Sequence, residues 1–229
     1  MKENRLPQFL KKGDKAIIVS PSGNTEIKYI EGAKSVLESW GLNVEIARYA
    51  TNSLGRFCGT INERLSDLQS AMDDDEAKLI LCSRGGYGAV HLIEELNFWK
   101  ITNNPKWLVG YSDITVIHQA FLRQGIISLH APMSRHLTED AKDNASLYLK
   151  EILFGNIPEF ITEGNILNRE GEAEGILFGG NLAVLCSLIG SAYAQFPKDS
   201  ILFIEDIAEP PYKIDRMIWT FKLARKSVV

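Results

Sequence analysis

The sequence predicts an α/β protein: an N-terminal parallel sheet with helices on both faces, followed by a smaller C-terminal α/β domain. Up to about residue 155, short apolar runs alternate with segments whose apolar residues recur at helical spacing. Turn-forming residues, mostly glycine, follow several of the apolar runs directly. Repetition of strand and helix is typical of a parallel sheet with right-handed crossovers.

The first two strands are predicted at the start of the chain. Residues 15–20 (KAIIVS) form an apolar run that ends in the turn residues 21–24 (PSGN). Apolar residues at helical spacing predict a helix from residue 27 to the glycine at 41. A second strand is expected over residues 43–49, and residues 51–60 are expected to form a loop.

The third strand leads into a glycine-rich segment. A helix is expected to begin at a cap formed by Asn62 and to continue to Ala77. The run 78–83 (KLILCS) predicts a buried strand, and it ends at residues 84–88 (RGGYG). Apolar residues at helical spacing then predict a helix over residues 90–96.

The fourth strand, residues 106–110 (KWLVG), leads into residues 111–113 (YSD). Residues 114–123 are predicted to be helical, residues 126–129 to form a fifth strand, and residues 141–153 to form a further helix. The strand–helix alternation ends here.

The pattern changes after residue 155. We divide the chain into an N-terminal α/β domain of residues 1–155, a linker over residues 156–172 and a C-terminal region over residues 173–229. Within the C-terminal region, residues 182–189 predict an apolar helix and residues 201–205 (ILFIE) a strand.

The composition predicts a globular protein without nucleic acid or membrane partners. Of the 229 residues, 45% are hydrophobic and 24% are charged, the net charge is −4 and the sequence pI is about 5.7. This balance offers no basic surface for nucleic acid or anionic lipid. No apolar run approaches the roughly 18 residues that span a bilayer, and residues 1–15 contain no signal-peptide core.

The cysteines indicate a reducing compartment. Cys58, Cys82 and Cys186 are scattered, with no CxxC pair that would indicate a zinc site or a disulfide framework. We therefore expect a cytoplasmic protein that holds no metal.

Three loops are candidates for chemistry, because ligands bind parallel sheets at the carboxyl ends of the strands. They are residues 20–24, 84–88 and 111–113. Ser112 follows a buried strand, precedes a helix and has Gly110 two positions before it, which is the pattern of a nucleophile elbow. Ile114 stands where the usual motif has a second glycine, and the alternative is that Ser112 simply caps the helix.

The glycine-rich segment 84–88 can present backbone N–H groups to an anion, either a phosphate or a tetrahedral intermediate. As a dinucleotide fingerprint it is weak, because His91 stands where the third glycine belongs. Asp113 could imitate the ribose-binding acid of that fingerprint, and a turn without any ligand is a further alternative.

A serine nucleophile needs a base and an acid that orients the base, and the chain offers candidates for both. Glu205 ends an apolar strand and can orient a histidine base, although such acids are often only solvated. His130 ends the fifth strand near the expected cleft and is the one plausible base within the chain. His91 and His118 fall inside predicted helices, and His136 is expected in a surface loop.

Together these segments resemble the LD-carboxypeptidase family of serine peptidases, which includes the microcin C immunity peptidases. The matching stretches, in the order of the family, are residues 19–23 (VSPSG), 84–88 (RGGYG), 110–113 (GYSD), 179–182 (GGNL) and 205–216 (EDIAEPPYKIDR). The order of five such segments over nearly the whole chain makes the resemblance specific.

The resemblance implies a Ser–Glu–His triad with Ser112 as the nucleophile and Glu205 as the acid. It also implies an oxyanion hole made by the N–H groups of Asp113 and Gly86, and no metal or other cofactor. The candidate substrate-binding residues are Arg84, Gly85, Tyr111 and Asn181. Members of the family are usually homodimers that release terminal D-Ala from murein tetrapeptides during cell-wall recycling in the cytoplasm.

The sequence departs from the family in one respect: the family's catalytic histidine lies in a segment that would follow residue 229. We therefore expect a truncated chain with an incomplete C-terminal domain and little activity. We expect the truncation to leave three apolar side chains exposed to solvent: Ile214, Ile218 and Phe221. Exposed apolar surface should favour a dimer or aggregation. The alternatives are an inactive muropeptide-binding protein, a peptidase for microcin C-type peptidyl-nucleotides, and a nucleotide-binding protein.

Overall fold

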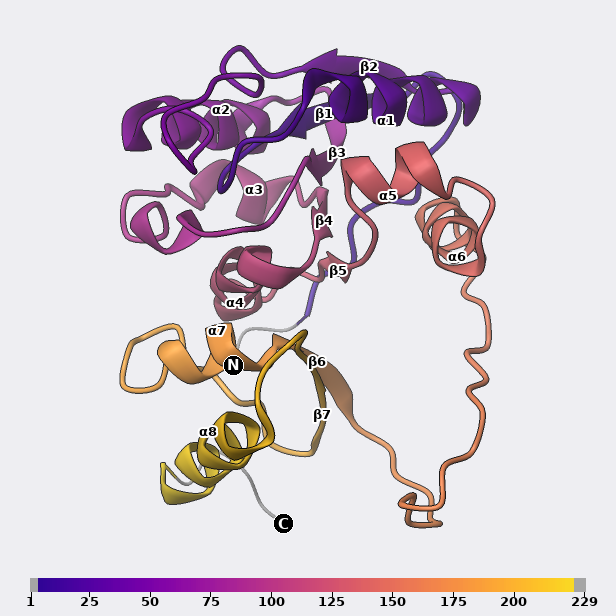
Figure 1. Cartoon of the computed structure of the whole chain (residues 1–229). Helices are drawn as coiled ribbons and strands as arrows, with labels where there is room; N and C mark the ends of the chain where they lie inside the picture. The colour runs from indigo at the N-terminus through magenta and orange to yellow at the C-terminus, as the bar shows by residue number, and fades with distance from the viewer. Residues whose placement is uncertain (1–3, 225–229) are drawn as a thin grey trace.

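The computed structural model describes residues 4–224 and confirms the α/β fold (Figure 1). Five strands form one sheet in the order β2-β1-β3-β4-β5, and every neighbouring pair is parallel. The strands are β1 (Lys15–Val19), β2 (Asn43–Ile46), β3 (Ala77–Cys82), β4 (Trp107–Gly110) and β5 (Leu129–His130). The carboxyl ends of these strands therefore lie along a single edge of the sheet.

Helices cover both faces of the sheet. They are α1 (Ile27–Ser39), α2 (Ile61–Asp73), α3 (Trp99–Asn103), α4 (Thr115–Arg123), α5 (Ser134–Glu139) and α6 (Asn144–Leu153), with the 3₁₀ turns η1 (Ala89–His91) and η2 (Ser112–Ile114). Side chains alternate across a strand, so Ile17 of β1 packs with α2 and α4 while Ile18 packs with α1 and α6. This alternation explains why the strands are apolar throughout.

Two local predictions were wrong at the residue level. Helix α2 begins at a capping box, in which Thr60 accepts from the N–H of Glu63 and the Glu63 side chain bonds back to Thr60, so Asn62 is not the cap. Residues 90–96 contain only the end of the 3₁₀ turn η1 and further hydrogen-bonded turns over residues 92–95, rather than a helix. Leu92, Ile93 and Leu96 are nevertheless buried, because consecutive turns can also direct apolar side chains into the core.

The C-terminal region forms a second, two-stranded parallel sheet. Its elements are β6 (Ile176–Asn181), α7 (Leu182–Ser187), β7 (Ser200–Glu205) and α8 (Pro211–Leu223). Phe221 of α8 is buried against Leu182 and Leu185, so the expectation that it is exposed was wrong. Ile214 and Ile218 are each 39% exposed, as expected for side chains without full cover.

The two sheets are joined by close backbone contacts. Thr115, at the start of α4, accepts a hydrogen bond from the N–H of Asn181 at 3.0 Å. A Cβ atom at Gly180 would lie 2.6 Å from the Thr115 side chain of the first sheet's domain. Within the second sheet, a Cβ atom at Gly179 would lie 1.7 Å from the carbonyl oxygen of Phe203 on β7. Both positions therefore require glycine. Residues 156–172 form no helix or strand and appear in Figure 1 as a long excursion between α6 and β6.

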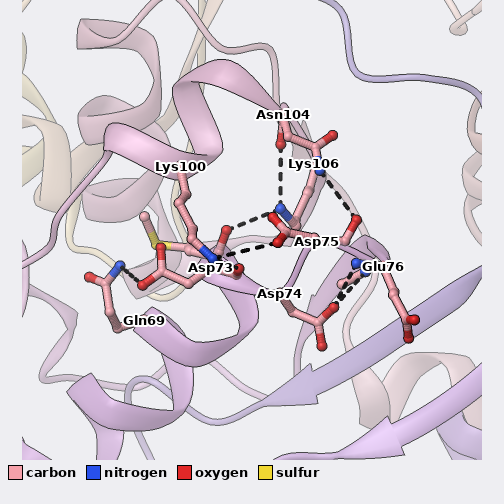
Figure 2. A network of polar contacts seen from close by, with 10 residues as sticks. Gln69, Asp73, Asp74, Asp75, Glu76, Lys100, Asn104 and Lys106 are labelled. Atoms are coloured by element: carbon pink, nitrogen blue, oxygen red, sulfur yellow. Dashed lines mark hydrogen bonds and ion pairs between the residues drawn. The ribbon is translucent and has the colours of Figure 1, made fainter.

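A polar network fixes the amino end of the sheet (Figure 2). Lys106 is buried beside β4, and its Nζ donates to the carbonyl oxygens of Met72 at 3.1 Å and Asn104 at 3.4 Å. Lys100 donates to the carbonyl oxygen of Asp73 at 3.0 Å, so two lysines satisfy the last turn of α2. Burial lowers the pKa of Lys106.

No helix among residues 4–224 is long and apolar enough to cross a membrane.

Candidate active site

The three predicted loops meet at the carboxyl edge of the sheet. The N–H of Gly23 donates to the carbonyl oxygen of Gly85 at 3.0 Å. A Cβ atom at Gly85 would lie 3.1 Å from Ser112 Oγ and 3.3 Å from the backbone nitrogen of Asp113. This confirms that the loops 84–88 and 111–113 are adjacent, and it shows that only glycine at position 85 permits the approach.

Ser112 has the strained backbone expected of an elbow. Its φ angle is 63°, in the left-handed region that costs an L-residue about 1–2 kcal/mol. No side-chain cap is present at the start of η2 or of α4, and the Ser112 hydroxyl makes no hydrogen bond to any of residues 4–224. The residue is partly exposed. Ser112 is therefore not a simple helix cap, and its hydroxyl is free to react.

The Asp113 carboxylate ties the other two loops to the elbow. Its Oδ2 accepts hydrogen bonds from the Ser22 hydroxyl at 2.6 Å and from the N–H of Ala89 at 2.9 Å. Asp113 is 4% exposed, and a carboxylate buried so deeply is stabilised by donors of this kind. The side chain that follows Ser112 thus fixes the glycine-rich segment.

Arg64, on α2, also links the loops 20–24 and 84–88. Its Nη1 donates to the carbonyl oxygens of Pro21 at 2.7 Å and Gly88 at 2.9 Å. Burial lowers the pKa of Arg64, and the nearby Asp113 opposes that shift. The role of Arg64 cannot be predicted from the sequence, because an arginine in an amphipathic helix carries no signal of burial.

Two glycines of the predicted anion site have positive φ angles, 109° for Gly86 and 128° for Gly88. These angles turn the backbone sharply beside Ser112, as a loop that presents N–H groups to an anion requires. The segment leads into the three-residue turn η1 and not into a helix. It therefore lacks the helix N-terminus on which a dinucleotide fingerprint depends. The roles of Gly86 and of the Asp113 N–H remain predictions.

His130 and Glu205 face each other across the two sheets. The parallel pair Gly110–His130 places His130 beside the elbow, and its Nε2 lies 3.7 Å from Glu205 Oε1. Burial lowers the pKa of His130 to about 4. Burial also raises the pKa of Glu205, and a hydrogen bond from Asn181 opposes this shift.

The predicted substrate-binding residues differ in exposure. Arg84 and Tyr111 lie at the surface, and Arg84 Nη1 donates to the carbonyl oxygen of Asn24 at 2.6 Å. Asn181 is buried, and its Oδ1 caps α7 by accepting from the N–H of Val184 at 3.1 Å. Gly85 lies against Ser112, because a Cβ atom built at Gly85 would be 2.9 Å from the Cβ atom of Ser112. Their roles toward a substrate remain predictions.

The remaining histidines are engaged elsewhere. His118 is buried, and its Nε2 lies 2.8 Å from the carbonyl oxygen of Gly110, so Nε2 must carry the proton and donate. His118 Nδ1 then accepts from the Ser128 hydroxyl. His136 pairs with Asp143 at the surface, on α5 rather than in a loop, and His91 packs edge-on against Tyr87. None of the histidines bonds to Ser112 in the described chain.

A hollow of the described surface lies away from the three loops. A groove of about 700 Å³ lies at the opposite edge of the sheet, beside Asp14, Lys15 and Glu76, where none of the three loops reaches. Among residues 4–224, no group of three or more His, Cys, Asp or Glu side chains could hold a metal ion.

Comparison with known proteins identifies relatives over both parts of the chain. Residues 17–131 match the LD-carboxypeptidase N-terminal domain, and residues 174–227 match the LD-carboxypeptidase C-terminal domain. A putative carboxypeptidase of Synechocystis sp. is 39% identical over 213 residues, which cover 93% of this chain and 69% of that protein. A probable murein peptide carboxypeptidase of Bacillus subtilis is 35% identical over 228 residues, covering 97% and 72%.

The fold of the chain is also similar to that of solved structures. The crystal structure of muramoyltetrapeptide carboxypeptidase from Oxalobacter formigenes matches with a TM-score of 0.82 and 29% sequence identity. The match covers 92% of this chain and 72% of that chain. The similarity therefore extends through both sheets.

Proposed function

This chain belongs to the LD-carboxypeptidase family, and we propose that it is the part of a serine peptidase that carries the nucleophile, the oxyanion hole and the triad acid. The proposed reaction is release of terminal D-Ala from a murein tetrapeptide. The observation that carries the proposal is the strained, unbonded Ser112 in contact with the glycine-rich segment.

The proposed mechanism is acyl transfer. Ser112 Oγ attacks the carbonyl carbon of the bond to D-Ala and loses its proton to an imidazole base, and the same base then protonates the leaving amine. Water, losing a proton to the same base, then hydrolyses the acyl–Ser112 ester and restores the hydroxyl. The N–H groups of Gly86 and Asp113 would stabilise the oxyanion, and the Asp113 carboxylate and Arg64 would keep these donors in place. Glu205 would orient the imidazole.

The position of the imidazole base decides the activity proposed for this chain. A serine hydroxyl is a poor nucleophile at neutral pH unless a positioned base takes its proton. Neither His118, whose ring nitrogens are both engaged, nor His130, which faces Glu205, bonds to Ser112 in residues 4–224. We therefore propose that the 229-residue chain alone has little activity, with only the residual catalysis expected after loss of one triad member.

The relatives favour a murein peptide as the substrate, because the names of the Bacillus subtilis and Oxalobacter formigenes proteins specify one. We further propose a cytoplasmic homodimer. The three free cysteines suit a reducing compartment, and exposed apolar side chains on the second sheet and α8 suit association. We also propose an N-terminal domain of residues 1–155 and a C-terminal region from residue 173; the positions of the two sheets support this division.

The test measures D-Ala release from a murein tetrapeptide and labelling by a fluorophosphonate. It compares the purified chain with Ser112→Ala and with Ser39→Ala, a control at an exposed serine. Slow release that disappears only in Ser112→Ala supports the proposed nucleophile. Release that survives in Ser112→Ala contradicts it, and fast release by the chain contradicts the claim of an incomplete site. Tetrapeptide binding without release or labelling would instead favour an inactive muropeptide-binding protein.

A further inference from the structure

Two buried polar atoms without partners lie close together behind the nucleophile. His130 Nδ1 and Glu205 Oε1 are each inaccessible and make no hydrogen bond to the described residues. The other ring nitrogen, His130 Nε2, is 3.7 Å from Glu205 Oε1. A hydrogen bond of normal length, about 2.7–3.2 Å, needs a movement of only about 0.5–1 Å.

The surroundings select one protonation state for this histidine. Burial lowers the pKa of His130 to about 4, so the ring is neutral at pH 7 and carries one proton. A proton on Nε2 points toward the carboxylate. A proton on Nδ1 would leave a buried N–H without an acceptor and would direct the lone pair of Nε2 at the carboxylate oxygen. The Nε2–H form is therefore favoured.

The other groups near the pair do not replace this contact. Phe203 packs edge-on against His130, with ring centroids 5.0 Å apart. Tyr111 and His118 face the same ring at 5.9 and 6.2 Å, and the N–H of His118 is already used by Gly110. On the side of the carboxylate, Asp206 raises the pKa of Glu205 and the Asn181 side chain lowers it.

We propose that His130 is a positioning residue, whose neutral Nε2–H donates to Glu205 and keeps this carboxylate ionised and correctly oriented. The proposal rests on the proposed role of Glu205 as the triad acid. A triad acid must be ionised to stabilise an imidazolium ion, and donors to a carboxylate favour its ionised form. His130 would oppose the effect of burial together with Asn181.

The test is an NMR titration of the Glu205 side-chain carboxyl in the full chain, with the signal assigned by Glu205→Gln. His130→Leu removes the donor at similar volume, whereas His130→Gln can place an amide N–H near the position of Nε2. His136→Ala is the matched control, because His136 pairs with Asp143 at the surface. We expect His130→Leu to raise the proton affinity of Glu205 about tenfold and His130→Gln to leave it near the wild-type value.

An unchanged Glu205 titration in His130→Leu, or an equal shift in His130→Gln, would overturn the proposal. If His130→Leu does not fold, the ¹⁵N spectrum of wild-type His130 decides: an Nε2–H ring supports the proposal and an Nδ1–H ring overturns it. These readouts need no turnover. The titration and the ¹⁵N spectrum can support the contact between His130 and Glu205 even if Glu205→Gln does not change D-Ala release. In that case the proposed role of Glu205 as the triad acid is wrong, but the proposed hydrogen bond from His130 is still supported.

Discussion

At the scale of single residues, Ser112, the proposed nucleophile, has a strained backbone. Its φ angle of 63° is one that glycine adopts freely and other residues avoid. We expect Ser112→Gly to be more stable than Ser112→Ala by about 1 kcal/mol, because only glycine relieves the strain. Urea unfolding of the two variants measures this difference, with Ser39→Ala as a control. Equal unfolding midpoints would mean that the elbow stores no strain.

His118 should make the fold sensitive to acid. Burial lowers the pKa of His118 to about 4, against about 6.5 in an unfolded chain. Between these values the unfolded state binds a proton that the folded state does not, so stability is full above pH 6.5 and falls as the pH decreases. At pH 5 the loss from His118 should be about 2 kcal/mol.

The check is chemical denaturation at pH 7.5 and pH 5 for the wild type and for His118→Gln. Glutamine can still donate to the carbonyl oxygen of Gly110 but does not titrate. The variant should lose less stability on acidification than the wild type. The pKa of His130 is also lowered by burial, so acidification should reduce the stability of the wild type and of the variant through this residue as well. Identical losses would show that His118 does not remain neutral in the fold.

The site was predictable where a local pattern specifies geometry. A strand followed at once by Gly-Tyr-Ser-Asp predicted the elbow, and glycines after β3 predicted the loop beside it. Arg64 and the contact between His130 and Glu205 could not be predicted, because they depend on segments far apart in the sequence. Pairing between β4 and β5, which sets the position of His130, is likewise a non-local contact.

At the scale of elements, long periodic segments were easier to predict than short ones. Strands β1 to β4 and helices α1, α2, α4 and α6 were expected close to their observed positions. Helices α3 and α5, with five and six residues, are too short to show a period. Strand β5 has two residues, Leu129 and His130, where four were expected over 126–129, because only its end pairs with β4.

Strand β6 should tolerate no side chain at its central glycine. A Cβ atom at Gly179 would lie 1.7 Å from the carbonyl oxygen of Phe203, and the φ angle of 151° is also unfavourable. Gly179→Ala should therefore destabilise the C-terminal region by about 3 kcal/mol or more, through overpacking and strain. Gly164→Ala is the matched control, because no atom lies within 4 Å of its Cβ position. Hydrogen exchange of β7 measures the effect, and equal protection in both variants would contradict it.

At the scale of the whole molecule, exposed apolar side chains gather on the C-terminal region. They include Leu177, Tyr212, Trp219 and Leu223. Contiguous apolar surface is commonly buried by association. Sedimentation velocity should therefore show concentration-dependent association of the chain, weakened by Trp219→Glu and unchanged by Trp99→Glu, a control at an exposed tryptophan of the other sheet's domain. A monodisperse monomer at high concentration would contradict this expectation.

The excursion over residues 156–172 has a consequence for how the chain can be assembled. The two sheets are held by contacts that do not pass through it: Asn181 with Thr115, Gln119 with the carbonyl oxygen of Gly179, and Tyr193 with that of Ile93. Covalent continuity there is dispensable, so a single cut should leave a nicked but joined protein. Two co-expressed polypeptides divided at Gly164 should copurify, and Gly179→Ala in the second should prevent it. Ser112 and Glu205 would then reside on separate, complementing fragments.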